Sequence, residues 1–267
     1  MNTIGFIGTG NMGGALARAA AKAVAADNIF LANRTMEKAG ALAADLGCHV
    51  ATVSEIADKC HLIFLGVKLQ MMAGLLQRIA PILHCRTTPF TLVSMAAGIT
   101  TADIQKMAGN TYPVIRIMPN IPVRCGSGVV LYCATENVPE EDLSAFRWAM
   151  SHAGLVDSLS EHLMDAGSAL SGCGPAFVSM FIEALADGAV RCGLTRQQAT
   201  AYACQTLIGT ANLLNETGIH PGALKDAVCS PGGSTICGVA ALEQANFRAA
   251  VIDAIDKAYK KNQELGK

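Results

Sequence analysis

A glycine-rich turn near the start of the chain has the spacing of a phosphate-binding loop. Residues 8–13 read Gly-Thr-Gly-Asn-Met-Gly and stand between a short aliphatic run and an alanine-rich segment. The first glycine permits a tight turn, the second lets the backbone approach a pyrophosphate, and the third lets a helix pack closely on a strand. Free N–H groups at the helix start would then face the phosphates. The pattern predicts a dinucleotide site formed by Gly8, Thr9, Gly10, Asn11 and Met12.

The residues after the second predicted strand indicate which dinucleotide binds. An NAD enzyme would carry Asp or Glu there to bind the ribose hydroxyls, whereas this chain has Asn33, Arg34 and Thr35. No carboxylate repels a 2′-phosphate, and an arginine and a hydroxyl can bind it, so NADPH is favoured and NADH is expected to serve less well. The alternative is an ordinary surface arginine after a strand.

Further candidate cofactor contacts follow later predicted strands, at the edge where open α/β sheets bind ligands. Small side chains after the fifth strand would permit close approach of the nicotinamide half of the cofactor. Plain strand-to-helix turns would have the same spacing, so the spacing does not separate the two interpretations. The candidates are Val67, Lys68, Met95, Ala96, Ala97, Gly98 and Asn120.

A second glycine-rich turn, Ser-Pro-Gly-Gly-Ser-Thr over residues 230–235, opens a helix in the second half of the chain. Clustered N–H groups and hydroxyls suit a small anion, and a carboxylate is favoured because a phosphate site would usually add Lys or Arg. A simple turn between two helices is the alternative. The candidate substrate contacts are Ser230, Gly232, Gly233, Ser234 and Thr235.

The elements that must position these residues change character partway along the chain. Up to residue 158, short aliphatic runs alternate with alanine-rich segments, which predicts a Rossmann-like α/β domain with a mostly parallel sheet over residues 1–158. Residues 159–267 carry only helix signals and are expected to form an all-helical domain. The expected strands span residues 3–7, 29–32, 49–53, 62–67, 91–96, 114–118 and 129–134. The helix signals are Ser160, Pro175, Thr195 with Gln198, Gly218 and Pro221.

Composition excludes several classes of protein. Lys and Arg number 20 against 21 for Asp and Glu, so no net field attracts nucleic acid or an anionic membrane. The ten cysteines are scattered, which indicates reduced thiols in the cytoplasm. The six histidines lack metal-ligand spacing, so no metal is expected. The start of the chain does not read as a signal peptide, and no uncharged apolar stretch looks long enough to span a bilayer.

The apolar content also indicates a partner subunit. Apolar residues make up 51% of the chain and charged residues 15%. In the predicted helix over residues 177–190, apolar side chains occupy nearly the whole circumference, which one neighbouring helix cannot cover. We therefore expect an obligate homodimer through the helical domain.

Taken in order, these motifs resemble the pyrroline-5-carboxylate reductase family, whose members reduce 1-pyrroline-5-carboxylate to L-proline in the last step of proline biosynthesis. The resemblance spans nearly the full length and is most specific over residues 220–235. The motifs that carry it are residues 8–13, 94–99, 116–120, 171–177 and 220–235.

The resemblance implies an N-terminal NADP-binding domain and a C-terminal domain for substrate binding and dimerisation, with a larger ring of dimers in many members. It implies that the turn at residues 230–235 binds the substrate carboxylate and that the Thr235 hydroxyl lies near the ring nitrogen. It also places Glu161 in the substrate site. One departure is Leu69, which follows Lys68 where the family often has proline.

Two other functions are weighed against this one. A 3-hydroxyacid dehydrogenase-like oxidoreductase shares the two-domain plan, but it carries a catalytic lysine one turn after a Gly-x-Gly. Here the Gly-x-Gly at residues 172–174 leads to Val178 and Ser179, with no lysine. A non-catalytic NADP-binding sensor is the second alternative. The glycine turn at residues 230–235 argues against a sensor.

Overall fold

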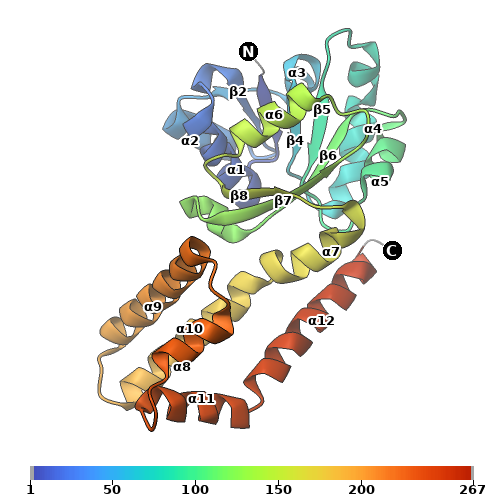
Figure 1. Ribbon diagram of the computed structural model, residues 1–267. Coiled ribbons are helices and arrows are strands. Elements are labelled where there is room, and N and C mark those ends of the chain that lie inside the picture. Colours follow the sequence, from blue (N-terminus) through green and yellow to red (C-terminus); the bar gives the residue numbers. More distant parts are fainter. Residues whose placement is uncertain (1–2, 266–267) are drawn as a thin grey trace. The chain divides into compact units, whose positions relative to one another are not determined.

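The computed structural model describes residues 3–265, and the chain forms two compact units. The first unit runs to Gly172 and takes up the chain again from Tyr259, and the second is Cys173–Ala258. In Figure 1 the first unit carries the sheet and the second is made of helices. The last strand ends at Ser158, and the helical turns over residues 161–172 belong to the sheet-containing unit.

The first unit is built on one eight-stranded sheet in the order β3-β2-β1-β4-β5-β6-β7-β8. Every neighbouring pair is parallel except β6 and β7, so the expected mostly parallel sheet is confirmed. The strands are β1 (Ile4–Ile7), β2 (Ile29–Ala32), β3 (His49–Val50), β4 (Leu62–Leu65), β5 (Thr91–Ser94), β6 (Val114–Pro119), β7 (Gly128–Ala134) and β8 (Gly154–Ser158).

Helices cover both faces of this sheet, which explains why its central strands read as continuous apolar runs. One apolar cluster joins the sheet to α1 (Asn11–Ala23), α2 (Met36–Leu46) and α6 (Glu140–Ala149). The other joins it to α3 (Val53–Lys59), α4 (Leu69–Cys85) and α5 (Thr101–Ala108). Phe6 stacks on Phe64 in the first cluster, with ring centroids 4.5 Å apart.

Two differences from the expected strands have local causes. The third strand stops at Val50 because Thr52 caps α3, where its hydroxyl accepts from the Glu55 N–H. The eighth strand was not predicted. Gly154–Ser158 lies at the sheet edge, where none of its residues is buried and its polar end gives no alternating pattern.

The second half contains the expected helices. Thr195 and Gln198 form a capping box, Gly218 ends the helix in the left-handed conformation with φ 64°, and Pro221 opens the next one. The Ser160 side chain caps nothing and instead precedes a 3₁₀ turn, Glu161–Leu163. A π-helical turn, Ser168–Gly172, follows α7. The helices are α7 (Met164–Gly167), α8 (Gly174–Arg191), α9 (Arg196–Thr217), α10 (Pro221–Val228), α11 (Ser234–Gln244) and α12 (Phe247–Leu265).

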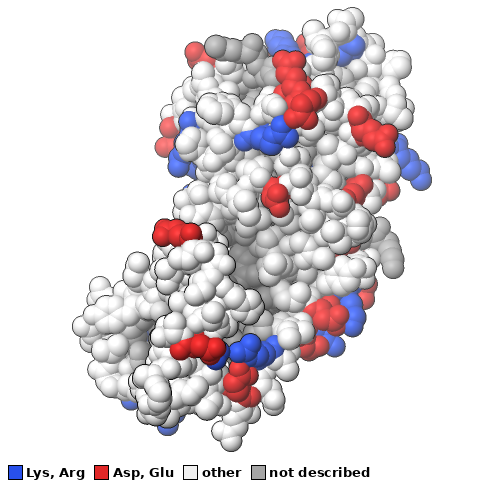
Figure 2. Space-filling view, viewed as in Figure 1, with Lys and Arg blue, Asp and Glu red and all other residues white. Residues whose placement is uncertain are grey.

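The helical unit buries little of its apolar surface. Its only buried residues among those described are Ala186, Ala199 and Ala203, while Met180 is 69% exposed. Most of this unit's surface in Figure 2 carries no charged group on the face in view. One helical stretch, residues 161–191, is long and apolar enough to cross a membrane by length and composition alone. It contains Asp165 and Glu183, so it differs from the uncharged stretch that the sequence was searched for.

Candidate active site

The first glycine turn has the close backbone approaches that its spacing predicts. Gly8 follows β1 with φ +102°, a conformation that favours glycine. A Cβ on Gly13 would lie 2.0 Å from the Gly8 carbonyl oxygen, so any side chain there would push α1 off the turn. By contrast, nothing lies within 4 Å of a Cβ placed on Gly10. The turn is therefore closed on its protein side and open at Gly10.

The start of α1 presents the donors that a pyrophosphate needs. Gly10 is the N-cap, no side chain caps the helix, and no acidic residue stands in the first turn. The first N–H groups of a helix have no partner within it, and they carry the positive end of the helix dipole. Thr9 adds a buried hydroxyl with no hydrogen-bond partner in the structure. These features fit a dinucleotide phosphate.

A second loop completes this turn, and sequence reasoning missed it. A Cβ on Gly66, just after β4, would lie 2.5 Å from the Gly8 carbonyl oxygen, and a Cβ on Gly8 would lie 2.4 Å from that of Gly66. The two loops therefore touch backbone to backbone. No spacing rule links residues 8 and 66, and only a glycine directly after an apolar strand could have signalled the contact.

Arg34, the cation just after β2, is exposed. Asn33 donates its side-chain amide to the Thr35 carbonyl oxygen at 3.1 Å, which shapes the turn into α2. Arg34 and Thr35 are exposed. Among the described residues, the Arg34 guanidinium has no hydrogen-bond or ion-pair partner, so it can bind an anion without breaking a bond.

The loops after β4 and β5 lie at the same sheet edge. Lys68 is exposed at the N-cap of α4, and Val67 beside it is half-buried. After β5, Ala96 is buried and Ala97 is exposed, and Gly98 has φ +75°. Met95 packs against the core. Small side chains thus leave the backbone of this loop accessible.

The loop after β5 ends in a capped helix. The Thr100 hydroxyl accepts from the Asp103 N–H, and the Asp103 carboxylate accepts from the Thr100 hydroxyl and N–H. These hydrogen bonds hold the pKa of Asp103 below its ordinary value. The cap fixes where α5 starts and therefore where the preceding loop ends.

Asn120 is engaged inside the protein. Its side-chain nitrogen donates to the Ser171 carbonyl oxygen at 2.9 Å, and its side-chain oxygen accepts from the Val129 N–H at 2.8 Å. Both ends of the amide are therefore used, and binding a cofactor through this side chain would break one of these bonds. Asn120 ties β6 and β7 to the π-helical turn.

Glu161 is similarly engaged. One carboxylate oxygen accepts from the Thr101 N–H at 2.8 Å and the other from the Thr101 hydroxyl at 2.9 Å. The guanidinium of Arg116, whose side chain is 4% exposed, lies 3.3 Å from Glu161 and 3.6 Å from Asp165. Burial, together with the nearby Glu161, raises the pKa of Cys133 to about 12. In the first unit, then, Glu161 braces the start of α5.

The second glycine turn also opens a helix. Gly232 has φ +68°, the Gly233 N–H donates to the Ser230 carbonyl oxygen at 3.0 Å, and a Cβ on Gly233 would lie 2.3 Å from the Ser230 hydroxyl. Gly233 is the N-cap of α11, and no side chain caps that helix. Ser234 and Thr235 are exposed, and their hydroxyls have no hydrogen-bond partner among the described residues.

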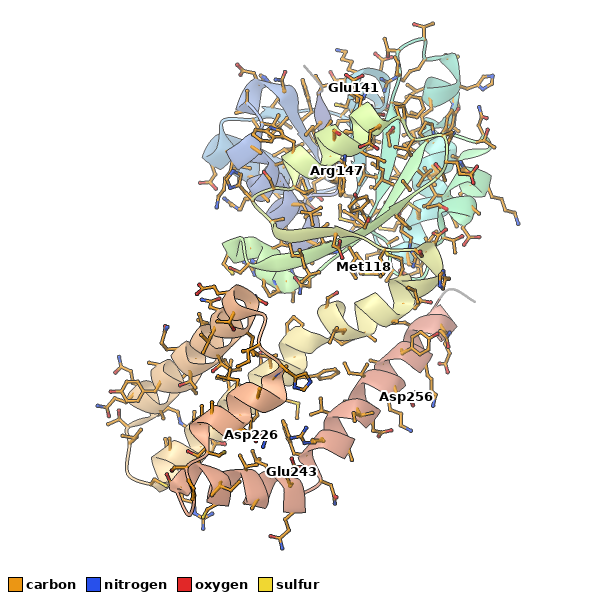
Figure 3. All side chains as sticks on the ribbon, viewed as in Figure 1. Met118, Glu141, Arg147, Asp226, Glu243 and Asp256 are labelled. Atoms are coloured by element: carbon orange, nitrogen blue, oxygen red, sulfur yellow. The ribbon has the colours of Figure 1, made fainter. Side chains whose placement is uncertain are left out.

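The surroundings of this second turn leave its N–H groups as the main anion ligands. Lys225 and Asp226 pair with each other at 2.5 Å on α10, and Arg248 pairs with Glu243 at 2.6 Å near the end of α11. Figure 3 labels the two acidic partners, Asp226 and Glu243, on these helices. Two nearby cations are therefore neutralised. The turn suits a small carboxylate better than a phosphate.

In the described part of the chain, no metal centre competes with these two sites. Within residues 3–265, no group of three or more His, Cys, Asp or Glu side chains is arranged to hold a metal ion. The two glycine turns themselves offer the N–H groups of two helix starts, and the second turn adds the hydroxyls of Ser234 and Thr235.

Comparisons with known proteins agree along the whole chain. The family model described as "Pyrroline-5-carboxylate reductase dimerisation" matches residues 161–265, and the one described as "NADP oxidoreductase coenzyme F420-dependent" matches residues 3–98. The pyrroline-5-carboxylate reductase of Escherichia coli K12 is 38% identical over 99% of this chain and 98% of its own.

Solved structures agree as well. A pyrroline-5-carboxylate reductase from Coxiella burnetii has a TM-score of 0.92 at 30% identity and covers 100% of this chain and 99% of its own. The Plasmodium falciparum pyrroline carboxylate reductase with NADP bound has a TM-score of 0.86 at 29% identity, and the match covers 100% of this chain and 98% of that one.

Proposed function

Because the chain belongs to the pyrroline-5-carboxylate reductase family, we propose that it reduces 1-pyrroline-5-carboxylate to L-proline with NADPH, the last step of proline biosynthesis. The observation that carries the proposal is the turn at residues 230–235, where an uncapped helix start and the unpartnered Thr235 hydroxyl suit a small imino acid. The substrate carboxylate accepts hydrogen bonds from the N–H groups, and the Thr235 hydroxyl hydrogen-bonds the ring nitrogen of the substrate.

In this proposal the sheet-containing unit binds the cofactor. The start of α1 binds the pyrophosphate through residues 8–12, and Asn33, Arg34 and Thr35 bind the adenosine end with its 2′-phosphate. Val67, Lys68 and residues 95–98 line the nicotinamide half. The chemistry that NADPH supplies when bound is a hydride for the carbon of the C=N bond. An NADP-bound relative and the NADP-type family model support this cofactor.

The helical unit binds the substrate in this proposal. N–H groups of the turn hold the carboxylate and so fix the orientation of the substrate ring. Thr235 hydrogen-bonds the ring nitrogen, which ends the reaction protonated because reduction of C=N consumes one hydride and one proton. Positioning and the exclusion of water supply most of the acceleration, and no covalent intermediate with the protein is needed.

The two parts of the chain have different roles in this proposal. We assign cofactor binding to residues 1–158, and substrate binding and dimerisation to residues 159–267. The dimerisation model over residues 161–265 supports a homo-oligomer. We propose a homodimer, extended into a ring of dimers, that works in the cytoplasm without nucleic acid or membrane. The apolar stretch at residues 161–191 then faces a second subunit and not lipid.

The experiment that tests this function follows NADPH oxidation by the purified protein. We expect turnover with 1-pyrroline-5-carboxylate and L-proline as the product, and none with 3-hydroxy or 2-keto acids. Oxidation with a keto acid but not with the imine would replace the proposal with a hydroxyacid dehydrogenase. NADPH binding without turnover of any of these substrates would instead indicate a non-catalytic NADP-binding sensor.

A further inference from the structure

A pocket of about 240 Å³ lies at the carboxyl ends of β2 and β3. Its wall includes Asn33, the residue next to Arg34, and the hydroxyl residues that precede and begin α3. It also includes one cation from a distant part of the chain, Arg78 on α4. The lining residues are Ala32, Asn33, Met36, Ala51, Thr52, Val53, Ser54 and Arg78.

Arg78 is uncommitted. Its guanidinium has no hydrogen-bond or ion-pair partner among the described residues. Arg86, just past the end of the same helix, differs: its guanidinium donates to the carbonyl oxygens of Ala57 and Cys60, both at 2.8 Å. Arg86 is therefore a structural arginine, whereas nothing within the fold holds Arg78.

No carboxylate lines the pocket. Two acidic residues adjoin the lining along the chain: Glu37, which follows Met36 and is exposed, and Glu55, which accepts hydrogen bonds from the N–H and the hydroxyl of Thr52, at 2.7 and 2.8 Å. The Glu55 carboxylate is therefore held at the start of α3, and neither glutamate lines the pocket. A phosphate entering the pocket would meet the Ser54 hydroxyl, the Asn33 amide and the Arg78 guanidinium, and no carboxylate lines the pocket.

We propose that Arg78 binds the 2′-phosphate of NADPH in this pocket, as a second cation beside Arg34, and so contributes to the choice of NADPH over NADH. The inference rests on the proposed function only for the identity of the cofactor. A guanidinium and a phosphate form charge-assisted hydrogen bonds, which are about twice as strong as neutral ones. A site in which two arginines hold the dianionic phosphate should favour NADPH over NADH more strongly than a site with Arg34 alone.

The test uses fragments of the cofactor, so it does not depend on turnover. Isothermal titration calorimetry measures binding of 2′,5′-ADP, which carries the 2′-phosphate, and of 5′-AMP, which lacks it. We expect Arg78→Ala to weaken 2′,5′-ADP about 10-fold and to change 5′-AMP less than about 2-fold. Arg78→Lys keeps a charge and should recover part of the loss. Gln77→Ala, a neighbouring exposed position on α4 outside the pocket, should change neither affinity.

Three outcomes would overturn the proposal: an unchanged affinity for 2′,5′-ADP, an equal loss for both fragments, or wild-type protein that does not distinguish them. The second outcome would assign Arg78 to the part that both fragments share, adenosine 5′-phosphate. Thermal unfolding of each variant separates loss of binding from loss of fold. Turnover of 1-pyrroline-5-carboxylate by the wild-type protein is measured separately, so its absence would contradict the proposed function while the fragment affinities would still test the role of Arg78.

Discussion

The two compact units bury their apolar side chains to very different extents. The sheet-containing unit encloses Phe6, Phe64 and Phe146 completely. Among the described residues of Cys173–Ala258, only three alanines are buried, while Met180 and Ile252 are 69% and 70% exposed. A set of helices with so little interior cannot offset the entropy cost of folding by itself. We therefore expect the sheet unit to be stable by itself and the helical unit to depend on association.

The helical unit has well-formed helices but leaves large apolar side chains exposed. Phe181 and Phe247 lie 5.6 Å apart between ring centroids, and capping residues set the ends of α9. Local signals thus build the helices, while large side chains on α8, α9 and α12 remain exposed. We expect a homodimer interface of the large apolar class, roughly 2,000 Å² or more.

The largest expected effect breaks the association. Phe181→Asp should yield aggregated or unfolded protein, because a charge on the face of α8 prevents its burial. The matched control is Trp148→Asp in the sheet unit. Trp148 is 64% exposed, so that variant should stay soluble. Light scattering measures both. A stable, active wild-type monomer at nanomolar concentration, or a soluble and active Phe181→Asp variant, would refute the inference that the helical unit depends on association.

The next prediction contrasts two truncations. Leu16→Ala empties space in the closed core and should lower the free energy of unfolding by about 2–5 kcal/mol, with no change in dimer affinity. Met180→Ala removes an exposed side chain and should instead raise the dimer dissociation constant about 10-fold or more, because a buried methionine contributes roughly 1.5–3 kcal/mol. Sedimentation at several concentrations measures the second effect. If both variants alter only unfolding, the helical unit does not depend on its partner.

Catalysis offers a third contrast. Thr235→Ala should lower kcat by about 10²-fold and leave NADPH binding intact, as expected when one positioned donor is lost. Thr235→Ser keeps the hydroxyl and should recover much of the rate. Steady-state kinetics with a separate titration of NADPH measures both effects. Unchanged turnover in Thr235→Ala would make the second glycine turn purely structural.

The counterpart in the sheet unit acts on the cofactor. Arg34→Ala removes a charge-assisted bond worth roughly 1.5–3 kcal/mol, so NADPH should bind about 10-fold or more weakly while NADH binding hardly changes. Comparing kcat/KM for the two cofactors gives the measurement. Equal losses for both would remove Arg34 from the 2′-phosphate site.

The smallest effect concerns helix caps. The pKa of Asp103 is lowered in the folded protein by its hydrogen bonds to Thr100. The stabilisation is therefore present above the unfolded pKa and is lost as pH falls through the folded pKa. The corresponding cap in the helical unit, Thr195 with Gln198, carries no titrating group.

Asp103→Asn should lower the Tm by about 2–4 °C at neutral pH and by less at an acidic pH below the lowered pKa of the folded wild-type carboxylate. Gln198→Ala should give the same shift at both pH values. Calorimetric scans at the two pH values measure the difference. A loss for Asp103→Asn that does not depend on pH would mean that its charge contributes nothing to the cap.

Local patterns predicted most of the fold. The glycine spacing located the first turn, because φ +102° at Gly8 and the tight contact of Gly13 with the turn constrain residue type directly. The capping box at Thr195 and the stop at Gly218 were also readable for this reason. The edge strand Gly154–Ser158 was missed because its half-exposed residues carry no periodic signal.

The sequence alone determined what depends on near neighbours: the two glycine turns, the ends of the helices, and the apolar character of α8. Only the tertiary structure decided which side chains remain free to bind ligands. Asn120 and Glu161 are engaged with residues at least nine positions away in the chain, whereas Arg78 lies beside Asn33 in one pocket with its charge unpaired. The physical reason is that a polar group already hydrogen-bonded within the fold must break that bond to bind a ligand, and its partner is set by how distant segments pack.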